Sequence, residues 1–133
     1  MMAITMATSV PELQMEAVRE RFPASSLTAN ADGSWTVEVR DVPLDPQRWS
    51  QSSTTMRFIL PVGYPAAKPD CFYADPELRL RGGAMPQASN IQALPHSGIN
   101  QLWFSWHVDY WNAARDSIFT FVRVVQVRLA AAG

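Results

Sequence analysis

The residues best suited to chemistry lie together in one segment of the sequence, residues 95–112. This segment holds the only two histidines, His96 and His107, and a serine, Ser105, that precedes His107 by two positions. Imidazole is the one side chain whose unperturbed pKa lies near neutral pH. A serine hydroxyl becomes a useful nucleophile when a neighbouring base accepts its proton. We therefore expect any catalytic chemistry of this protein to take place here.

Three of the five tryptophans, Trp103, Trp106 and Trp111, lie in the same segment. Aromatic rings at this density fix a loop through their large apolar contact area. The simplest interpretation is that these rings belong to the core. Another is a small ligand-binding domain in which exposed rings stack on a sugar or a nucleobase, and the exposure of the rings decides between the two.

Length and composition predict one globular domain spanning residues 1–133. A chain of this length buries one sizeable core, and 47% apolar with 17% charged residues is typical of a folded chain. The net charge of −1 and the scattered arginines argue against binding to nucleic acid or to a membrane surface. The first seven residues lack the basic start of a secretory signal, and no apolar run is long enough to span a bilayer. We therefore expect a cytoplasmic protein.

Cys71 is the only cysteine, so an internal disulfide and a zinc site of several cysteines are excluded. Two histidines and one cysteine distant from them are few ligands for a metal ion, so we expect no catalytic metal and no cofactor. Cys71 is a second candidate nucleophile, but a free cysteine more often packs as a small apolar residue. A reactive cysteine needs a cationic surrounding and exposure, and the neighbouring residues indicate neither.

The beginning of the sequence predicts a helix over residues 10–21. Ser9 and Glu12 stand at the two positions of a capping box, immediately before an apolar run. An apolar stripe with helical spacing follows, formed by Leu13, Ala17, Val18 and Phe22.

Farther along, alternation of apolar and polar residues predicts strands separated by turn residues. The last apolar run has helical spacing and is too long for a strand without a turn. The predicted elements are strands near residues 35–40, 55–60 and 71–73, a long ordered loop over residues 77–100 and a helix over residues 113–130. This order predicts an α+β fold in which helices pack against an antiparallel sheet.

A strand, a Tyr-Pro turn and a further proline occupy residues 58–69, with the sequence FILPVGYPAAKP. This pattern resembles the ubiquitin-conjugating enzymes. His96 begins the triplet His-Ser-Gly at the place of that family's His-Pro-Asn motif, and Ser105 follows near the position of the family's nucleophilic cysteine. Trp111 begins a triplet similar to the family's downstream Trp-Ser-Pro. The resemblance covers nearly the whole chain and is greatest to bacterial relatives found beside activating enzymes and ubiquitin-like proteins.

The sequence departs from the family pattern at the catalytic positions. No cysteine occurs in residues 90–115, and Gly98 stands where the family has the asparagine that helps its oxyanion. The segment from Ser105 to Trp111 is also shorter than its counterpart in the family. Thioester chemistry at the usual position is therefore excluded, while the motif at residues 58–69 and the order of elements support the fold.

The resemblance implies a ubiquitin-conjugating-enzyme-like fold: an N-terminal helix, an antiparallel β-meander, a long active-site loop and a C-terminal helix. It also implies a carrier that receives a ubiquitin-like protein from an ATP-using activating enzyme and passes it to a target amine or hydroxyl. In this interpretation Ser105 accepts the carboxyl group as an oxyester and His107 is the base. His96 is a second polar group near the acyl centre, Asp109 orients His107, and the three tryptophans wall the site.

Two alternatives remain open. In the first, the chemistry takes place on Cys71. In the second, the chain is a catalytically inactive relative that docks a ubiquitin-like protein or its activating enzyme, because a fold by itself does not imply an activity.

Overall fold

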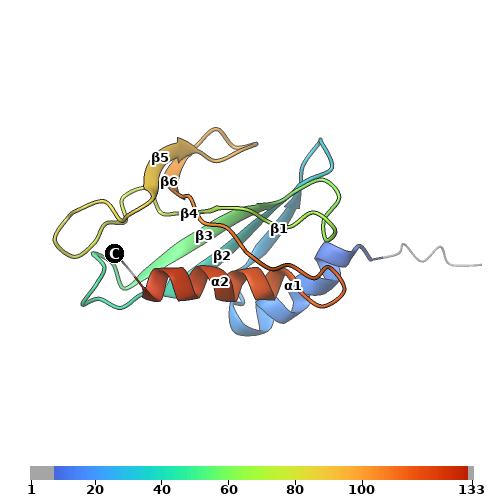
Figure 1. The fold of residues 1–133 in the computed structure, drawn as a ribbon, viewed down its shortest axis with the longest axis horizontal. Coiled ribbons are helices and arrows are strands. Elements are labelled where there is room, and N and C mark those ends of the chain that lie inside the picture. Colours follow the sequence, from blue (N-terminus) through green and yellow to red (C-terminus); the bar gives the residue numbers. More distant parts are fainter. Residues whose placement is uncertain (1–7, 132–133) are drawn as a thin grey trace, which may run out of the picture.

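The computed structural model describes residues 8–131, so residues 1–7, in which the sequence predicts no secretory signal, lie outside the described part. Within residues 8–131, two helices and six strands follow one another. In order they are α1 (Val10–Arg21), β1 (Ser26–Ala29), β2 (Trp35–Pro43), β3 (Ser53–Leu60), β4 (Phe72–Ala74), β5 (Ser89–Ala93), β6 (Asn100–Phe104) and α2 (Ile118–Ala130). The structure confirms the predicted α+β class, with both helices on one face of the sheet (Figure 1).

The helix α1 begins as predicted, with the capping box formed by Ser9 and Glu12. The Ser9 hydroxyl accepts a hydrogen bond from the Glu12 backbone amide at 3.3 Å, and the Glu12 carboxylate accepts one from the Ser9 amide at the same distance. The predicted apolar stripe is correct in part. Val18 and Phe22 are buried as expected, whereas Leu13 is 52% exposed and Ala17 is exposed. Met15, which the stripe did not include, is fully buried.

All strand pairs are antiparallel, and the order across the sheet is β1-β2-β3-β4-β6-β5. The first four strands form a meander, in which β2, β3 and β4 correspond to the three predicted strands and β1 is an additional strand. The last two depart from chain order, because β6 inserts between β4 and β5. In β2 the pairing with β3 shifts between Val39 and Val42, where Asp41 adopts a φ of 58°.

The core lies between the inner face of the sheet and the two helices. Met56, Phe58 and Leu60 of β3 point to this side and are fully buried, as the alternation in the sequence predicts. The Phe58 ring packs on Phe121 of α2 with 4.7 Å between ring centroids. Farther along the sheet, Phe72 of β4 and Phe104 of β6 stack at 4.5 Å.

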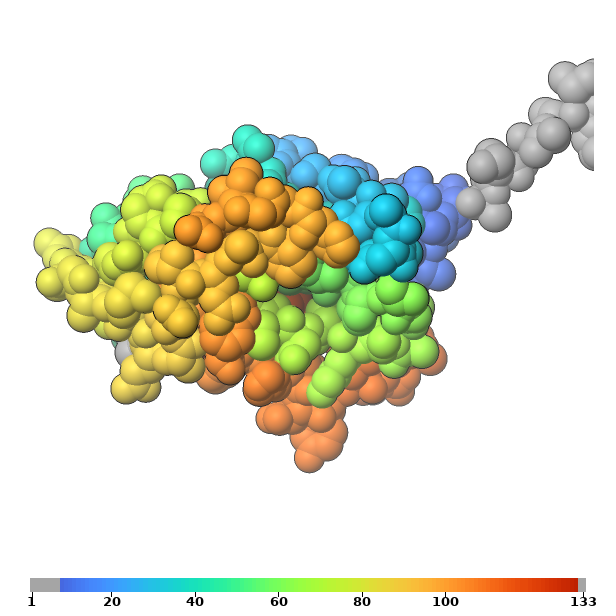
Figure 2. All heavy atoms as spheres, turned by 90° about the horizontal axis from the view of Figure 1, so that it is seen from above, coloured from blue at the N-terminus to red at the C-terminus, as the bar shows by residue number. Residues whose placement is uncertain are grey.

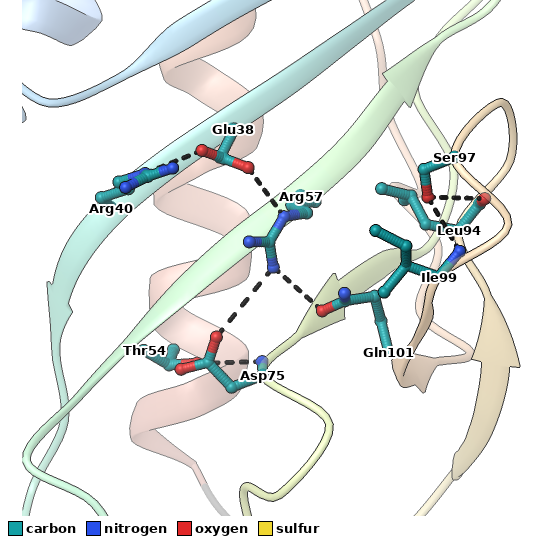
Figure 3. Close-up of polar contacts among 9 residues, drawn as sticks. All are labelled: Glu38, Arg40, Thr54, Arg57, Asp75, Leu94, Ser97, Ile99 and Gln101. Atoms are coloured by element: carbon teal, nitrogen blue, oxygen red, sulfur yellow. Dashed lines mark hydrogen bonds and ion pairs between the residues drawn. The ribbon is translucent and has the colours of Figure 1, made fainter.

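The face of the sheet away from the helices carries a polar network, drawn in Figure 3. Arg57 of β3 is at its centre. Its guanidinium donates to the Glu38 carboxylate of β2 at 2.9 Å and to the Gln101 side-chain oxygen of β6 at 2.9 Å, and it lies 4.0 Å from the Asp75 carboxylate. Glu38 also accepts from Arg40 at 2.8 Å. The network therefore connects strands from both halves of the sheet.

The prediction of one long loop over residues 77–100 is wrong, because this region contains β5 and the start of β6. The β5–β6 hairpin turns at residues 94–99, where the Leu94 amide donates to the Ile99 carbonyl at 2.9 Å. Four of the five β5 residues are exposed. An edge strand of this kind is held by backbone pairing and shows no apolar alternation that a sequence pattern could detect.

The C-terminal helix begins five residues later than predicted, at Ile118. A turn precedes it, in which the Asp116 carboxylate accepts from the Asn112 amide at 2.7 Å. The Gln14 side chain of α1 accepts from the Ile118 amide at 2.9 Å, which satisfies one of the free amides at the start of the helix. At the other end, the buried Trp49 indole donates to the Leu129 carbonyl at 2.8 Å.

Candidate functional site

The candidate site lies where β4 begins and β6 ends, because Phe72 and Phe104 are paired residues at the same end of the sheet. The chain that leaves β6 passes beside the chain that enters β4. The Cys71 amide donates to the Trp106 carbonyl at 2.9 Å, and the Lys68 ammonium donates to the Val108 carbonyl at 2.5 Å. Figure 2 shows these two segments, orange and yellow-green, against each other.

Ser105 and His107 border the same shallow hollow, of about 320 Å³, together with Trp106 and Asp109. Ser105 is half-buried, and its amide donates to the Ala88 carbonyl before β5 at 2.8 Å. His107 and Asp109 are exposed. The structure thus brings together the two residues that the sequence analysis assigned as nucleophile and base.

The imidazole of His107 is oriented by Asp70 rather than by Asp109. Its Nδ1 lies 2.5 Å from a carboxylate oxygen of Asp70, and both side chains are more than half exposed. This contact joins residues 37 positions apart. Because no local spacing relates Asp70 to His107, the sequence alone does not predict this contact.

Cys71 lies immediately before β4 and is half-buried. Cys71 is distant from the histidines only along the sequence. In the structure, the ligating atoms of Asp70, Cys71 and His107 all lie within 4.8 Å of one another. Burial raises the pKa of the Cys71 thiol, and the neighbouring Asp70 carboxylate raises it further.

His96 occupies a different part of the molecule, the turn between β5 and β6, with a φ of 68°. Its Nε2 lies 3.6 Å from the Asp32 carboxylate and 3.3 Å from the Ser34 hydroxyl. The whole of β6 separates this turn from Ser105, a span of roughly 17 Å at about 3.4 Å per residue. The structure therefore does not bring His96 to the hollow that Ser105 and His107 share.

The three tryptophans have different surroundings. Trp103 is a half-buried residue of β6. The Trp111 indole donates to the Pro65 carbonyl at 2.8 Å, and its ring packs on Tyr64 at 6.0 Å, so it fastens the loop before α2 to the Tyr-Pro turn. Trp106 alone borders the hollow, and it is 37% exposed. The rings do not form one continuous surface on which a ligand could stack.

Arg128 of α2 supports the hollow from beneath. Its guanidinium carbon lies 5.1 Å from the centre of the Trp106 ring and 5.6 Å from that of Phe104. The side chain also donates to the Gln87 carbonyl at 2.9 Å. Arg128 is only 6% exposed, so the position of Trp106 depends on a cation at the edge of the core.

The fold and this arrangement of segments define a ubiquitin-conjugating-enzyme-like domain: an N-terminal helix, an antiparallel sheet with a Tyr-Pro turn between β3 and β4, a polar hollow after β6, and a C-terminal helix. Residues 25–132 match the family model described as Prokaryotic E2 family E. The match runs from just before β1 through α2, which is most of the chain, and the chain belongs to this family. It confirms the resemblance to a bacterial member of the superfamily.

Comparison with curated proteins and with solved structures gives no match. Family membership supports a role in conjugation by ubiquitin-like protein machinery at the level of the class. In residues 8–131, no helix combines the length and the apolar character that crossing a membrane requires.

Proposed function

We propose that this protein carries a ubiquitin-like protein between an ATP-using activating enzyme and a target, and that Ser105 holds the carried protein as an oxyester. Membership of the prokaryotic E2 family supports the carrier role. The observation that supports the assignment of residues is that Ser105 borders the same hollow as an imidazole already oriented by a carboxylate. His96 has no part in the proposed reaction because it lies in the distant β5–β6 turn.

In the proposed reaction, the Ser105 hydroxyl oxygen attacks the activated C-terminal carbonyl of the ubiquitin-like protein, which arrives as a thioester on the activating enzyme. A carbon–oxygen bond forms, and the carbon–sulfur bond to the activating enzyme breaks. His107 takes the hydroxyl proton on Nε2, because Asp70 occupies Nδ1, and passes it to the departing thiolate. Asp70 stabilises the imidazolium that forms in between, as a carboxylate does in serine-histidine-acid sites.

The second step transfers the acyl group from Ser105 to an amine or hydroxyl of the target. An ester reacts less readily with amines than a thioester does, so this step needs stronger stabilisation of the developing charge. Loss of a histidine base lowers a rate by roughly 10²–10⁴-fold. His107 is therefore expected to affect both formation and discharge of the adduct.

A second candidate function is a non-covalent binding module that docks a ubiquitin-like protein or its activating enzyme. A specific observation favours it. Among the described residues, His107 is hydrogen-bonded to Asp70 and not to the Ser105 hydroxyl, and the pKa of the Cys71 thiol is raised rather than lowered. Neither candidate nucleophile has the direct activating contact that covalent catalysis uses.

The experiment combines this protein with its activating enzyme, the ubiquitin-like protein and ATP, and follows adduct formation. The variants are Ser105→Ala, Cys71→Ala and His107→Gln, and His96→Gln is the matched histidine control. The proposal predicts an adduct that resists thiol reductant, is cleaved by hydroxide, disappears in Ser105→Ala and persists in His96→Gln. A reductant-sensitive adduct lost in Cys71→Ala contradicts the oxyester. If neither the wild-type protein nor any variant forms an adduct, but binding to the ubiquitin-like protein or its activating enzyme is retained, the function is that of a binding module.

A further inference from the structure

Asp70, Cys71 and His107 present three different donor atoms to one point beside the hollow. We propose that this cluster is a binding site for a divalent transition-metal ion of the zinc class, held by the Asp70 carboxylate, the Cys71 thiolate and the His107 imidazole. The three ligating atoms lie within 4.8 Å of one another. This inference does not depend on the proposed carrier function, and it revises the expectation from sequence that this chain lacks a metal site.

The donor set matches the preferences of zinc. Zinc binds cysteine sulfur at about 2.3 Å, histidine nitrogen at about 2.0–2.1 Å and carboxylate oxygen at about 2.0–2.2 Å. Two ligands of one tetrahedral ion are then roughly 3.3–3.7 Å apart. The Asp70 carboxylate oxygen and His107 Nδ1 lie 2.5 Å apart, so they must separate by about 1 Å to share one ion. Because both side chains are more than half exposed, this rotation meets little resistance.

The backbone holds the cluster in this arrangement. Successive side chains of an extended chain point to opposite faces, so Asp70 and Cys71 would normally point apart. Cys71 adopts a φ of 60°, a left-handed conformation that costs an L-residue roughly 1–2 kcal/mol, and this interrupts the alternation. The hydrogen bond from the Cys71 amide to the Trp106 carbonyl then fixes His107, the next residue, against both side chains.

The electrostatics of the cluster suit a cation better than they suit a nucleophile. A reactive cysteine needs a positive surrounding that favours the thiolate, whereas Cys71 is half-buried beside the Asp70 carboxylate. A divalent ion placed between the two groups reverses this balance, because it neutralises the carboxylate and the thiolate together. Binding therefore releases the thiol proton, and the ion replaces the hydrogen bond between His107 and Asp70.

Three protein ligands leave one tetrahedral position for water or another small ligand, which is the pattern of zinc sites that keep an open position. In the part of the chain that the structure describes, no fourth histidine, cysteine or carboxylate belongs to the cluster. His107 borders the hollow, and the side chains of His107 and Asp70 are more than half exposed, so solvent reaches the cluster. We therefore expect weaker, reversible binding than at a closed four-ligand site.

Cobalt(II) is the probe, because a cobalt–thiolate bond gives a near-ultraviolet charge-transfer band and tetrahedral cobalt gives intense visible bands. The untagged, reduced, metal-free protein is titrated with cobalt(II) and then with zinc(II). We expect one cobalt per chain, a thiolate band, and displacement by one equivalent of zinc. The protein needs no ubiquitin-like partner for this measurement, so failure of the carrier function would not affect it.

Variants test the assignment of each ligand. Cys71→Ser removes the thiolate band, and Asp70→Asn and His107→Gln each lower the affinity by at least about tenfold. His96→Gln, which removes the other histidine, leaves the band and the affinity unchanged. Far-ultraviolet circular dichroism confirms that each variant is folded. The proposal would be overturned if the wild-type protein gave no thiolate band. It would also be overturned if cobalt binding survived Cys71→Ser and was lost in His96→Gln.

Discussion

The buried cation beneath the hollow, Arg128, gives the most informative perturbation. Among the described residues no carboxylate lies within ion-pair distance of it, so two aromatic rings and the Gln87 carbonyl are what compensate its charge. Because Arg128 is only 6% exposed, its surroundings disfavour the cation, and this burial lowers its pKa. The side chain therefore contributes to stability in two opposed ways, through its packed stem and through its charge.

The substitutions Arg128→Met and Arg128→Ala separate these contributions. Methionine keeps the buried stem but removes two cation–π contacts, worth roughly 0.5–2 kcal/mol each, and a charged hydrogen bond of roughly 1.5–3 kcal/mol. It also removes the cost of several kcal/mol of holding an unpaired cation out of water. These terms nearly cancel, so Arg128→Met should change the free energy of unfolding by about 1 kcal/mol or less. Arg128→Ala also empties the space of the stem and should cost about 2–4 kcal/mol.

Urea unfolding followed by tryptophan fluorescence measures both variants. We also expect the emission spectrum of the folded protein to change in Arg128→Met, because the cation over Trp106 is gone. If Arg128→Met destabilised the protein as much as Arg128→Ala, the charge would carry the stability and the reasoning from burial would be refuted.

Three further predictions concern other parts of the molecule. Burial opposes ionisation of Glu38, but hydrogen bonds from Arg40 and Arg57 prevail and lower its pKa. The ionised Glu38 therefore stabilises the folded protein above the unfolded-state pKa of about 4.3, and this stabilisation is lost as the pH falls through the lowered folded-state pKa. Glu38→Gln should therefore reduce the loss of stability with falling pH in acid titrations followed by circular dichroism. Trp49→Phe should lower the free energy of unfolding by about 1–3 kcal/mol in urea, because it leaves the buried Leu129 carbonyl without its donor, and an unchanged midpoint would contradict this. Saturating zinc should slow formation of the acyl adduct by roughly 10²-fold or more, since it occupies the base His107. Cys71→Ser should abolish that inhibition. This prediction rests on both the proposed oxyester carrier and the proposed metal site.

Much of the fold follows from local sequence signals. The capping box at Ser9 and Glu12 places the start of α1, and the alternation through residues 55–60 places β3 and its buried face. The Tyr-Pro segment identifies the family, and the family model confirms it. Each of these features depends on residues that are close together along the chain, and a single sequence shows such local patterns directly.

The sequence-based predictions are wrong where tertiary contacts determine which residues are buried and where an element begins. The buried face of α1 includes Met15 rather than Leu13, because several faces of this helix carry apolar residues and the position of the sheet selects one. The strand β5 is polar and exposed, so only its pairing with β6 makes it a strand. The helix α2 begins at Ile118 because a turn precedes it and Gln14 of α1 accepts from its first amide.

The candidate site was predictable in part. The proximity of Ser105 and His107 follows from their spacing of two, and the structure places both at one hollow. Their relation to residues 70 and 71 could not be predicted, because it depends on which strand pairs with β6. The insertion of β6 beside β4 brings Asp70 and Cys71 to His107 and leaves His96 at the far end of the hairpin.

The position of the acyl bond decides whether Ser105 is the acceptor. After reaction with the activating enzyme, the ubiquitin-like protein and ATP, the adduct is digested at acidic pH, which preserves esters, and the modified peptide is sequenced by mass spectrometry. We expect the C-terminal residue of the ubiquitin-like protein on Ser105 of the wild-type chain and no modified peptide from Ser105→Ala. Attachment to Cys71 or to Lys68, with Ser105 unmodified, would contradict it.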